Sequence, residues 1–135
     1  MSSDCIFCKI VAGDIDAWKV YEDEEFVAFL DRTQVRDGHS LVIPKAHYAN
    51  IHQTPDVLLG KLAIATKHVA NIVKEKVSAD GVTILQCNDV AGLQSVFHIH
   101  FHVIPGWDND HIAEPWTARF LDADYMSQVH ARFTS

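Results

Sequence analysis

The chain has 135 residues, of which 48% are hydrophobic and 21% are charged, as expected for one soluble globular domain with one core. Its formal net charge is −7 and its 11 Lys and Arg residues are scattered, so it carries no basic stripe of the kind that binds nucleic acid polymers, and acidic membrane lipid would repel it. A small anionic ligand is still compatible with this charge, because it needs only a local group of donors.

The N-terminal stretch lacks the basic and apolar regions of a signal peptide, and no apolar run approaches the roughly 20 residues that span a bilayer. We therefore expect a cytoplasmic protein whose three cysteines are reduced. We expect a single domain over residues 1–135, with a core from about residue 5 to 105 and a tail, 106–135, that the sequence does not assign.

Five strands and one long helix are predicted in chain order. The helix begins with a capping hydroxyl at Thr54 and proline at the first helical position, Pro55, and it continues to about Val77. One apolar face at helical spacing supports it: Leu58, Leu62, Ala65, Val69 and Ile72. The predicted strands are two within 19–31 around an acidic turn, then 39–44, 81–88 and 96–105. This order predicts an α+β fold, a five-stranded antiparallel sheet with one long helix packed on it.

Three histidines alternate along the last predicted strand, at His98, His100 and His102. Successive side chains of a strand point to opposite faces, so the imidazoles share one face. The other face carries an apolar row that can cover a core: Phe97, Ile99, Phe101 and Val103. A half-exposed polar face is the plain alternative, but three clustered titratable groups more often mark a functional site.

Two chemistries fit this row of imidazoles. Two of them could bind one metal ion, although the strand offers no Asp or Glu as a further ligand. Alternatively, one neutral imidazole attacks a phosphorus centre while its neighbours bind and protonate. The attacking ring must then carry its proton on the other nitrogen and donate it, for which a backbone carbonyl is the expected acceptor.

Cys5 and Cys8 supply half of a tetrahedral zinc site. A redox role would place the pair at the start of a helix in a βαβ unit, and the residues around it do not indicate that setting. The plain alternative is two small buried residues.

Several motifs resemble the histidine-triad (HIT) family, in the order "CIFCKI" (5–10), "LVIPKAH" (41–47) and "HIHFHVIP" (98–105). The likeness is to the Hint branch and its zinc-containing bacterial relatives. It implies a nucleotidyl hydrolase or transferase that acts at the α-phosphate of a purine nucleotide through a covalent nucleotidyl-histidine. It also implies a homodimer, formed through the long helix and an edge strand.

The resemblance implies roles for residues at matching positions. His100 is the nucleophile, His102 contacts the phosphoryl oxygens, and His39 is a further histidine of the site. Asp31 binds the ribose hydroxyls, a role that suits a carboxylate, although a turn residue after a strand is the plain alternative. The remaining positions are Asn88, which donates to the phosphate, and Gln94 and Ser95, which lie beside the leaving group. In the bacterial relatives the zinc ligands that join the two cysteines match His47 and His98, which implies structural zinc.

The sequence departs from the family pattern at two positions. Leu93 stands between Gly92 and Gln94, where the family has glycine directly before the glutamine. Arg32 replaces the apolar residue that faces the base. Both departures favour the alternative of a nucleotide-binding or protein-interaction module of the same fold with little turnover, whereas the triad favours a hydrolase with metal-independent catalysis.

Overall fold

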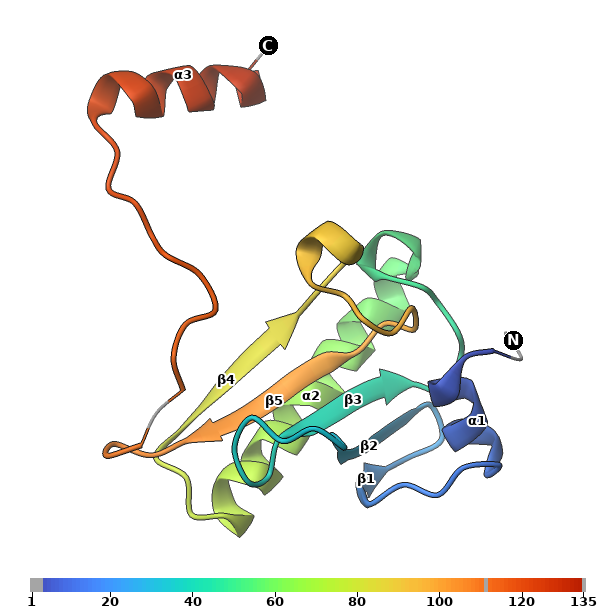
Figure 1. Ribbon diagram of the computed structural model, residues 1–135. Helices are drawn as coiled ribbons and strands as arrows, with labels where there is room; N and C mark the ends of the chain where they lie inside the picture. Colours follow the sequence, from blue (N-terminus) through green and yellow to red (C-terminus); the bar gives the residue numbers. More distant parts are fainter. Residues whose placement is uncertain (1–3, 111, 135) are drawn as a thin grey trace.

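The computed structural model describes residues 4–110 and 112–134. A five-stranded sheet lies between two helices, and a third helix stands apart from it (Figure 1). The helices and strands are α1 (Ile6–Ala12), β1 (Lys19–Glu22), β2 (Phe26–Leu30), β3 (Ser40–Pro44), α2 (Asp56–Lys76), β4 (Gly81–Gln86), β5 (Phe101–Gly106) and α3 (Ala123–Thr134). The strand order is β1-β2-β3-β5-β4 and all neighbours are antiparallel, which confirms the predicted α+β fold.

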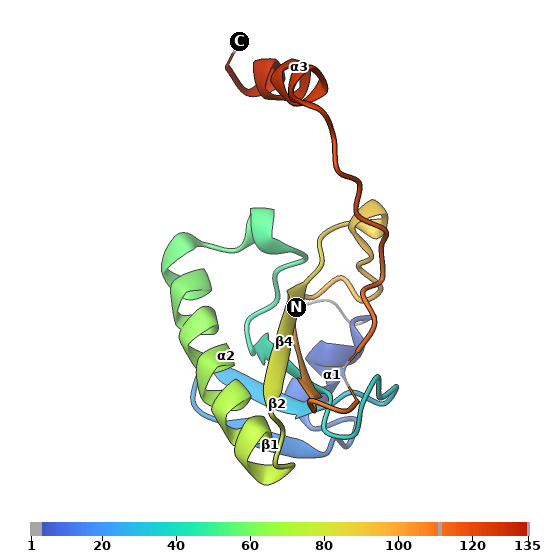
Figure 2. The same ribbon diagram turned by 90° about the vertical axis from the view of Figure 1, so that its left-hand side faces the viewer.

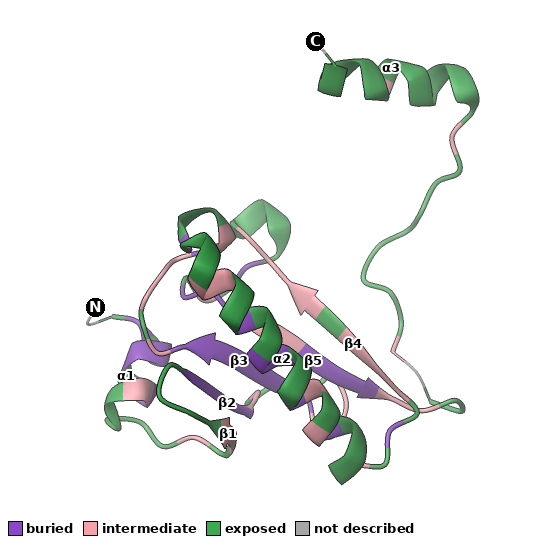
Figure 3. Ribbon diagram, turned by 180° about the vertical axis from the view of Figure 1, so that it is seen from behind, coloured by how far each residue is buried: buried purple, intermediate pink, exposed green. Residues whose placement is uncertain are grey.

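The pleat of the central strand β3 divides the core into two layers. Val42 packs with Leu62 and Val69 of α2 on one face of the sheet. Leu41 and Ile43 point to the opposite face, into the cluster that includes α1. Figure 2 shows α2 and α1 on opposite sides of the sheet, and Figure 3 shows that β3 is buried along its length. Both faces of β3 are therefore covered. Its side chains are apolar or have their polar groups hydrogen-bonded within the protein, as expected of a strand that is buried on both sides.

Helix α1 is a feature that the sequence analysis did not predict. Cys5 is its N-cap, the Cys5 sulfur accepts from the backbone N–H of Cys8 at 3.3 Å, and Gly13 ends it with φ +84°. The expectation that this pair does not lie at a helix start is therefore wrong. A helix of seven residues is too short to be stable alone, and burial of Phe7 and Ile10 against the sheet holds it.

Helix α2 starts one residue later than predicted. Pro55 is the N-cap, with no side-chain cap, and the helix runs from Asp56 to Lys76. The buried hydroxyl of Thr54 donates to the carbonyl of Asn50 at 2.8 Å, so it closes the preceding turn instead of capping the helix.

The last two strands are shorter than predicted. β4 ends at Gln86, and β5 pairs with its neighbours only from Phe101 onward. The stretch before Phe101 lies outside the ladder and bends at residues 96–98, which leaves Phe97 48% exposed instead of on the core face. Ile99 is nevertheless fully buried, so the alternation of sides persists beyond the end of the ladder.

The tail forms α3 after an irregular stretch that leads away from the sheet (Figures 1 and 3). Phe120 and Phe133 are among its exposed apolar side chains. Within residues 4–110 and 112–134, no helix is both long enough and apolar enough to cross a bilayer.

An added methyl group should have opposite effects on the free energy of unfolding at two glycines. Gly38 has φ +108°, and a Cβ there would lie 3.1 Å from Cγ1 of Val77 and 3.4 Å from Cγ of Pro105. Gly38→Ala should lower the free energy of unfolding by ~1–3 kcal/mol. Gly60, inside α2, has open space at this position, so Gly60→Ala should raise it by ~1 kcal/mol. Urea unfolding measures both, and equal effects of the two changes would contradict the backbone argument.

Candidate functional site

The three triad histidines point to the α1 side of the sheet, as the alternation predicts. The stretch that carries His98 and His100 is fixed by a hydrogen bond from the backbone N–H of Ile99 to the carbonyl of Tyr48 at 2.8 Å. His102 lies within β5. The rings of His100 and His102 are in contact, with their centroids 4.9 Å apart.

Phe7 of α1 covers this row of imidazoles. Its ring meets His100 edge-on at 5.2 Å between centroids and His98 at 5.8 Å. The unpredicted helix thus removes two imidazoles from water, and His98 is fully buried while His100 is 4% exposed.

His100 has a defined tautomer. Its Nδ1–H donates to the carbonyl of His98 at 2.8 Å, which confirms the expected backbone acceptor and leaves Nε2 with a free lone pair. Burial lowers the pKa of His100, and this effect outweighs the hydrogen bond to His98 and the charge of Asp31, which raise it. The ring is therefore neutral at pH 7 and can act as a nucleophile.

His102 presents a donor nitrogen, whereas His100 presents an acceptor, because the hydrogen bond from His39 fixes the tautomer of His102. The backbone N–H of Val35 donates to Nδ1 of His39 at 3.2 Å, so the neutral ring of His39 carries its proton on Nε2. That nitrogen lies 3.0 Å from Nδ1 of His102, which must accept. His102 then holds its own proton on Nε2, as a donor.

Burial lowers the pKa of both histidines in this pair. For His102 it is lowered to about 4, with further contributions from His100 and His39. For His39, burial outweighs the charge of Asp31, whose Oδ2 lies 3.5 Å from Nε2 of His39. The site therefore offers one acceptor nitrogen on His100 and one donor nitrogen on His102, a pair suited to attack on phosphorus with support of its oxygens.

The triad strand itself carries no carboxylate, and the fold brings Asp31 close to it. Ligand atoms of Asp31, His39 and His102 lie within 4.8 Å of one another. A metal ion there would require the Nε2 lone pair of His39, and the hydrogen bond from Val35 places a proton on that nitrogen. The arrangement fits a hydrogen-bonded relay better than a metal centre.

A cavity of about 650 Å³ opens beside His100 and His102. Asp31 and Ser95 line it, as expected of residues that bind a nucleotide. Much of the wall is apolar: Ile6, Phe7, Ile10, Ile15, Phe29, Leu41 and Val96. An apolar chamber that ends in a few converging polar groups is typical of a small-molecule site.

The sequence analysis missed the contributions of Phe7 and Trp18 to this cavity. Trp18 lies just before β1, and the guanidinium of Arg32 sits over its ring at 5.2 Å from the centroid. Phe7 lies within the "CIFCKI" motif, but no role was expected for it, and Trp18 belongs to no recognisable motif. Only the apolar spacing after Cys5 could have indicated α1, and seven residues are too few for a periodicity to be decisive.

Gln94 and Asn88 are not among the residues that line the cavity. The buried amide of Gln94 accepts from the backbone N–H of Asp89 at 2.7 Å and donates to the carbonyls of Ala49 at 2.6 Å and Val96 at 3.0 Å. The Asn88 side chain accepts from the backbone N–H of Ile51 at 2.8 Å and pairs with Gln86. Both amides tie loops together in this structure, and the ligand contacts that the resemblance implies for them stay predictions.

Leu93 takes the conformation that glycine favours. It has φ +73° and is 66% exposed, at the end of a short 3₁₀ turn over Val90–Gly92. A left-handed non-glycine residue costs about 1 kcal/mol or more. The loop keeps Gln94 buried despite this cost.

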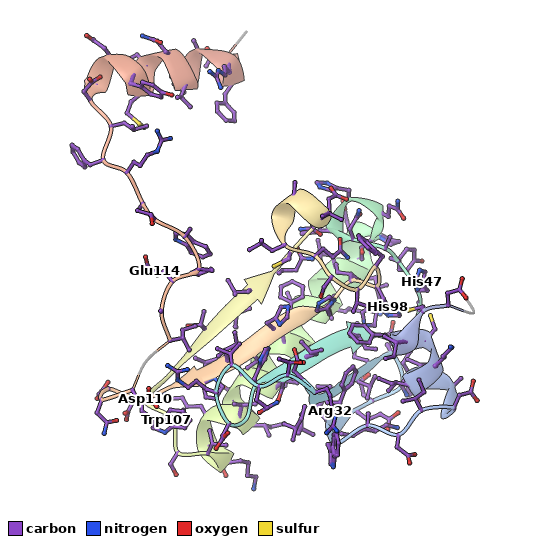
Figure 4. All side chains as sticks on the ribbon, viewed as in Figure 1. Arg32, His47, His98, Trp107, Asp110 and Glu114 are labelled. Atoms are coloured by element: carbon purple, nitrogen blue, oxygen red, sulfur yellow. The ribbon has the colours of Figure 1, made fainter. Side chains whose placement is uncertain are left out.

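The second cluster joins the four predicted metal ligands. The Nδ1 atom of His98 lies 3.1 Å from Nδ1 of His47, 3.4 Å from Sγ of Cys5 and 3.6 Å from Sγ of Cys8. Figure 4 shows His47 and His98 together beside α1. Tetrahedral zinc with its usual N and S bond lengths places its ligand atoms ~3.3–3.8 Å apart, so the spacing of this set fits.

The tautomer of His98 also fits a metal ligand. Its Nε2 lies 2.8 Å from the carbonyl of Pro44 and donates to it, which leaves the Nδ1 lone pair directed at the cysteines. Burial lowers the pKa of His98 to about 4, so this nitrogen is unprotonated at neutral pH.

Comparisons with known proteins agree with this geometry. A family model described as the HIT domain matches residues 12–109, which is most of the chain. The chain belongs to the HIT family. It is 45% identical over 104 residues to the protein named Protein hit from Bacillus subtilis, covering 77% of this chain and 72% of that protein.

Two further relatives of this HIT protein bear on its chemistry. It is 35% identical over 131 residues to the adenosine 5′-monophosphoramidase HNT1 of Saccharomyces cerevisiae, covering 96% of this chain and 80% of that enzyme. The crystal structure of a zinc-bound histidine triad family protein from Mycobacterium smegmatis superposes with a TM-score of 0.77 at 33% identity, covering 96% of this chain and 97% of that one.

The internal role of Gln94 makes a testable prediction about stability. Gln94→Ala leaves one backbone N–H and two carbonyls without their partner, so it should lower the free energy of unfolding by ~1–3 kcal/mol. Urea unfolding measures this, with Gln128→Ala on exposed α3 as a control that changes stability little. A folded Gln94→Ala protein of unchanged stability would instead favour the ligand-binding role.

Proposed function

We propose that this HIT protein is a purine-nucleotide phosphoramidase or related nucleotidyl hydrolase that works through a covalent intermediate on His100. The observation that carries the proposal is the hydrogen bond from Nδ1–H of His100 to the carbonyl of His98, beside a cavity sized for a nucleotide. The yeast relative named as an adenosine 5′-monophosphoramidase supports the same reaction class.

The geometry of the site suggests the order of steps. The Nε2 lone pair of His100 attacks the α-phosphorus in line and forms a bond from phosphorus to Nε2, while the P–N bond to the leaving amine breaks. His102 donates Nε2–H to the phosphoryl oxygens, and its ring is held by His39. Ser95, which lines the cavity, is the candidate donor to the departing nitrogen.

Water completes the reaction. It attacks the same phosphorus, the bond between phosphorus and Nε2 of His100 breaks, and the nucleoside monophosphate leaves. Asp31 lines the same cavity and is proposed to hold the ribose hydroxyls through both steps.

We also propose structural zinc at Cys5, Cys8, His47 and His98, supported by their spacing and by the zinc-bound relative. Zinc bound there would pin α1 to the stretch that carries His100 without taking part in the reaction.

We further propose the homodimer and the cytoplasmic location expected from the sequence. Exposed apolar side chains on α2 and on the edge strand β4, such as Ile64 and Ile84, are compatible with the dimer.

The catalytic proposal predicts a large loss of activity in one variant. His100→Ala should lower kcat/KM for release of AMP from adenosine 5′-phosphoramidate by at least ~10⁴-fold, because the nucleophile is removed. His130→Ala, on exposed α3, is the matched control and should keep full activity. Activity should also persist with a chelator present. A folded wild-type protein that binds AMP but releases none would favour the binding module.

The zinc proposal predicts a defined metal content. Protein purified without chelator should hold about one equivalent of zinc per chain, as four ligands at one site imply. Cys8→Ser should lose most of it, and Cys87→Ser, a cysteine outside the cluster, should not. Less than half an equivalent by elemental analysis, unchanged by added zinc, would overturn the assignment.

A further inference from the structure

Two side chains of opposite charge, one acidic and one basic, line the nucleotide cavity in addition to the residues already given a role. Asp16 and Arg32 both line it, on either side of Trp18 in the chain. They come from segments that run side by side, because the backbone N–H of Leu30 donates to the carbonyl of Trp18 at 2.9 Å. The proposed reaction uses other polar groups of the cavity and gives no role to Asp16 or Arg32. These two charges therefore need a separate explanation.

Neither charged side chain has a polar partner within the described part of the protein. Across residues 4–110 and 112–134, Asp16 and Arg32 form no ion pair or hydrogen bond, with each other or with another side chain. The guanidinium of Arg32 instead lies over the ring of Trp18. This contact holds the planar guanidinium in a preferred place while its N–H donors stay available.

The pair offers donors and acceptors that one kind of purine can use. Guanine has two adjacent acceptors, O6 and N7, which arginine binds in a bidentate way, and two donors, N1–H and the 2-amino group, which suit a carboxylate. Adenine has an amino group in place of O6 and an unprotonated N1. It would direct a donor at the guanidinium and an acceptor at the carboxylate.

We propose that Asp16 and Arg32 select guanine, so that guanosine nucleotides are the preferred substrates of this chain. Arg32 donates to O6 and N7, Asp16 accepts from N1–H and the 2-amino group, and Trp18 positions Arg32. The inference deepens the proposed function, on which it rests, and it departs from the adenosine specificity named for the yeast relative.

The test compares guanosine 5′-phosphoramidate with adenosine 5′-phosphoramidate on the full chain. We expect kcat/KM to favour the guanosine compound by about tenfold or more, the lower end for bidentate contacts because both charges are exposed. Arg32→Leu and Asp16→Asn should each bring this ratio toward one. Asp14→Asn changes an exposed acid that is not among the cavity-lining residues, and should leave the ratio unchanged.

The outcomes separate this inference from the proposed function. Hydrolysis of both compounds with a ratio at or below one, or a ratio that neither variant changes, overturns guanine selection and leaves the hydrolase intact. Hydrolysis of neither compound overturns the proposed function. Guanine selection is then decided by calorimetric dissociation constants for GMP and AMP, where equal values for the two nucleotides reject it.

Discussion

The site depends on His98, a residue that uses each of its polar groups for a different purpose. Its Nε2–H is bonded to the carbonyl of Pro44 at the end of β3, and its Nδ1 faces the two cysteines and His47. Its own backbone carbonyl accepts a hydrogen bond from Nδ1–H of His100. Full burial makes each of these bonds obligatory, since an unpaired polar group there would cost ~1–3 kcal/mol. The ring therefore fixes α1, β3 and the nucleophile in one arrangement.

Side chains in this region alternate between two sides, so the histidines of the site and the residues of the core point in opposite directions. Ile99 and Val103 pack toward α2, while His98, His100 and His102 point toward α1. The alternation continues where the ladder has ended, and the hydrogen bond from the backbone N–H of Ile99 to the carbonyl of Tyr48 ties this stretch to the segment after β3. One short segment thus supplies both part of the core and the reactive row.

Burial then decides how the imidazoles differ. All three triad rings and His39 have lowered pKa values, so neutral forms prevail, and the surrounding backbone selects the tautomer. A carbonyl beside His100 makes it an acceptor toward the cavity. A backbone N–H beside His39 makes His102 a donor. Identical side chains acquire different tasks from their neighbours, which is how one residue type can both attack and stabilise.

The sequence by itself determined the α+β class and the shared face of the triad, and its likeness to the HIT family predicted which four residues meet in the second cluster. Each rests on local periodicity or on motif order, both of which are written in consecutive residues. Tertiary structure decided what depends on distant partners: helix α1, the inward turn of Gln94, the carboxylate of Asp31 beside His39, and the tautomers. It also brought Asp16 and Arg32 to one cavity, although 15 residues lie between them in the chain. Such contacts follow from the packing of the whole sheet and its helices, and no local pattern encodes them.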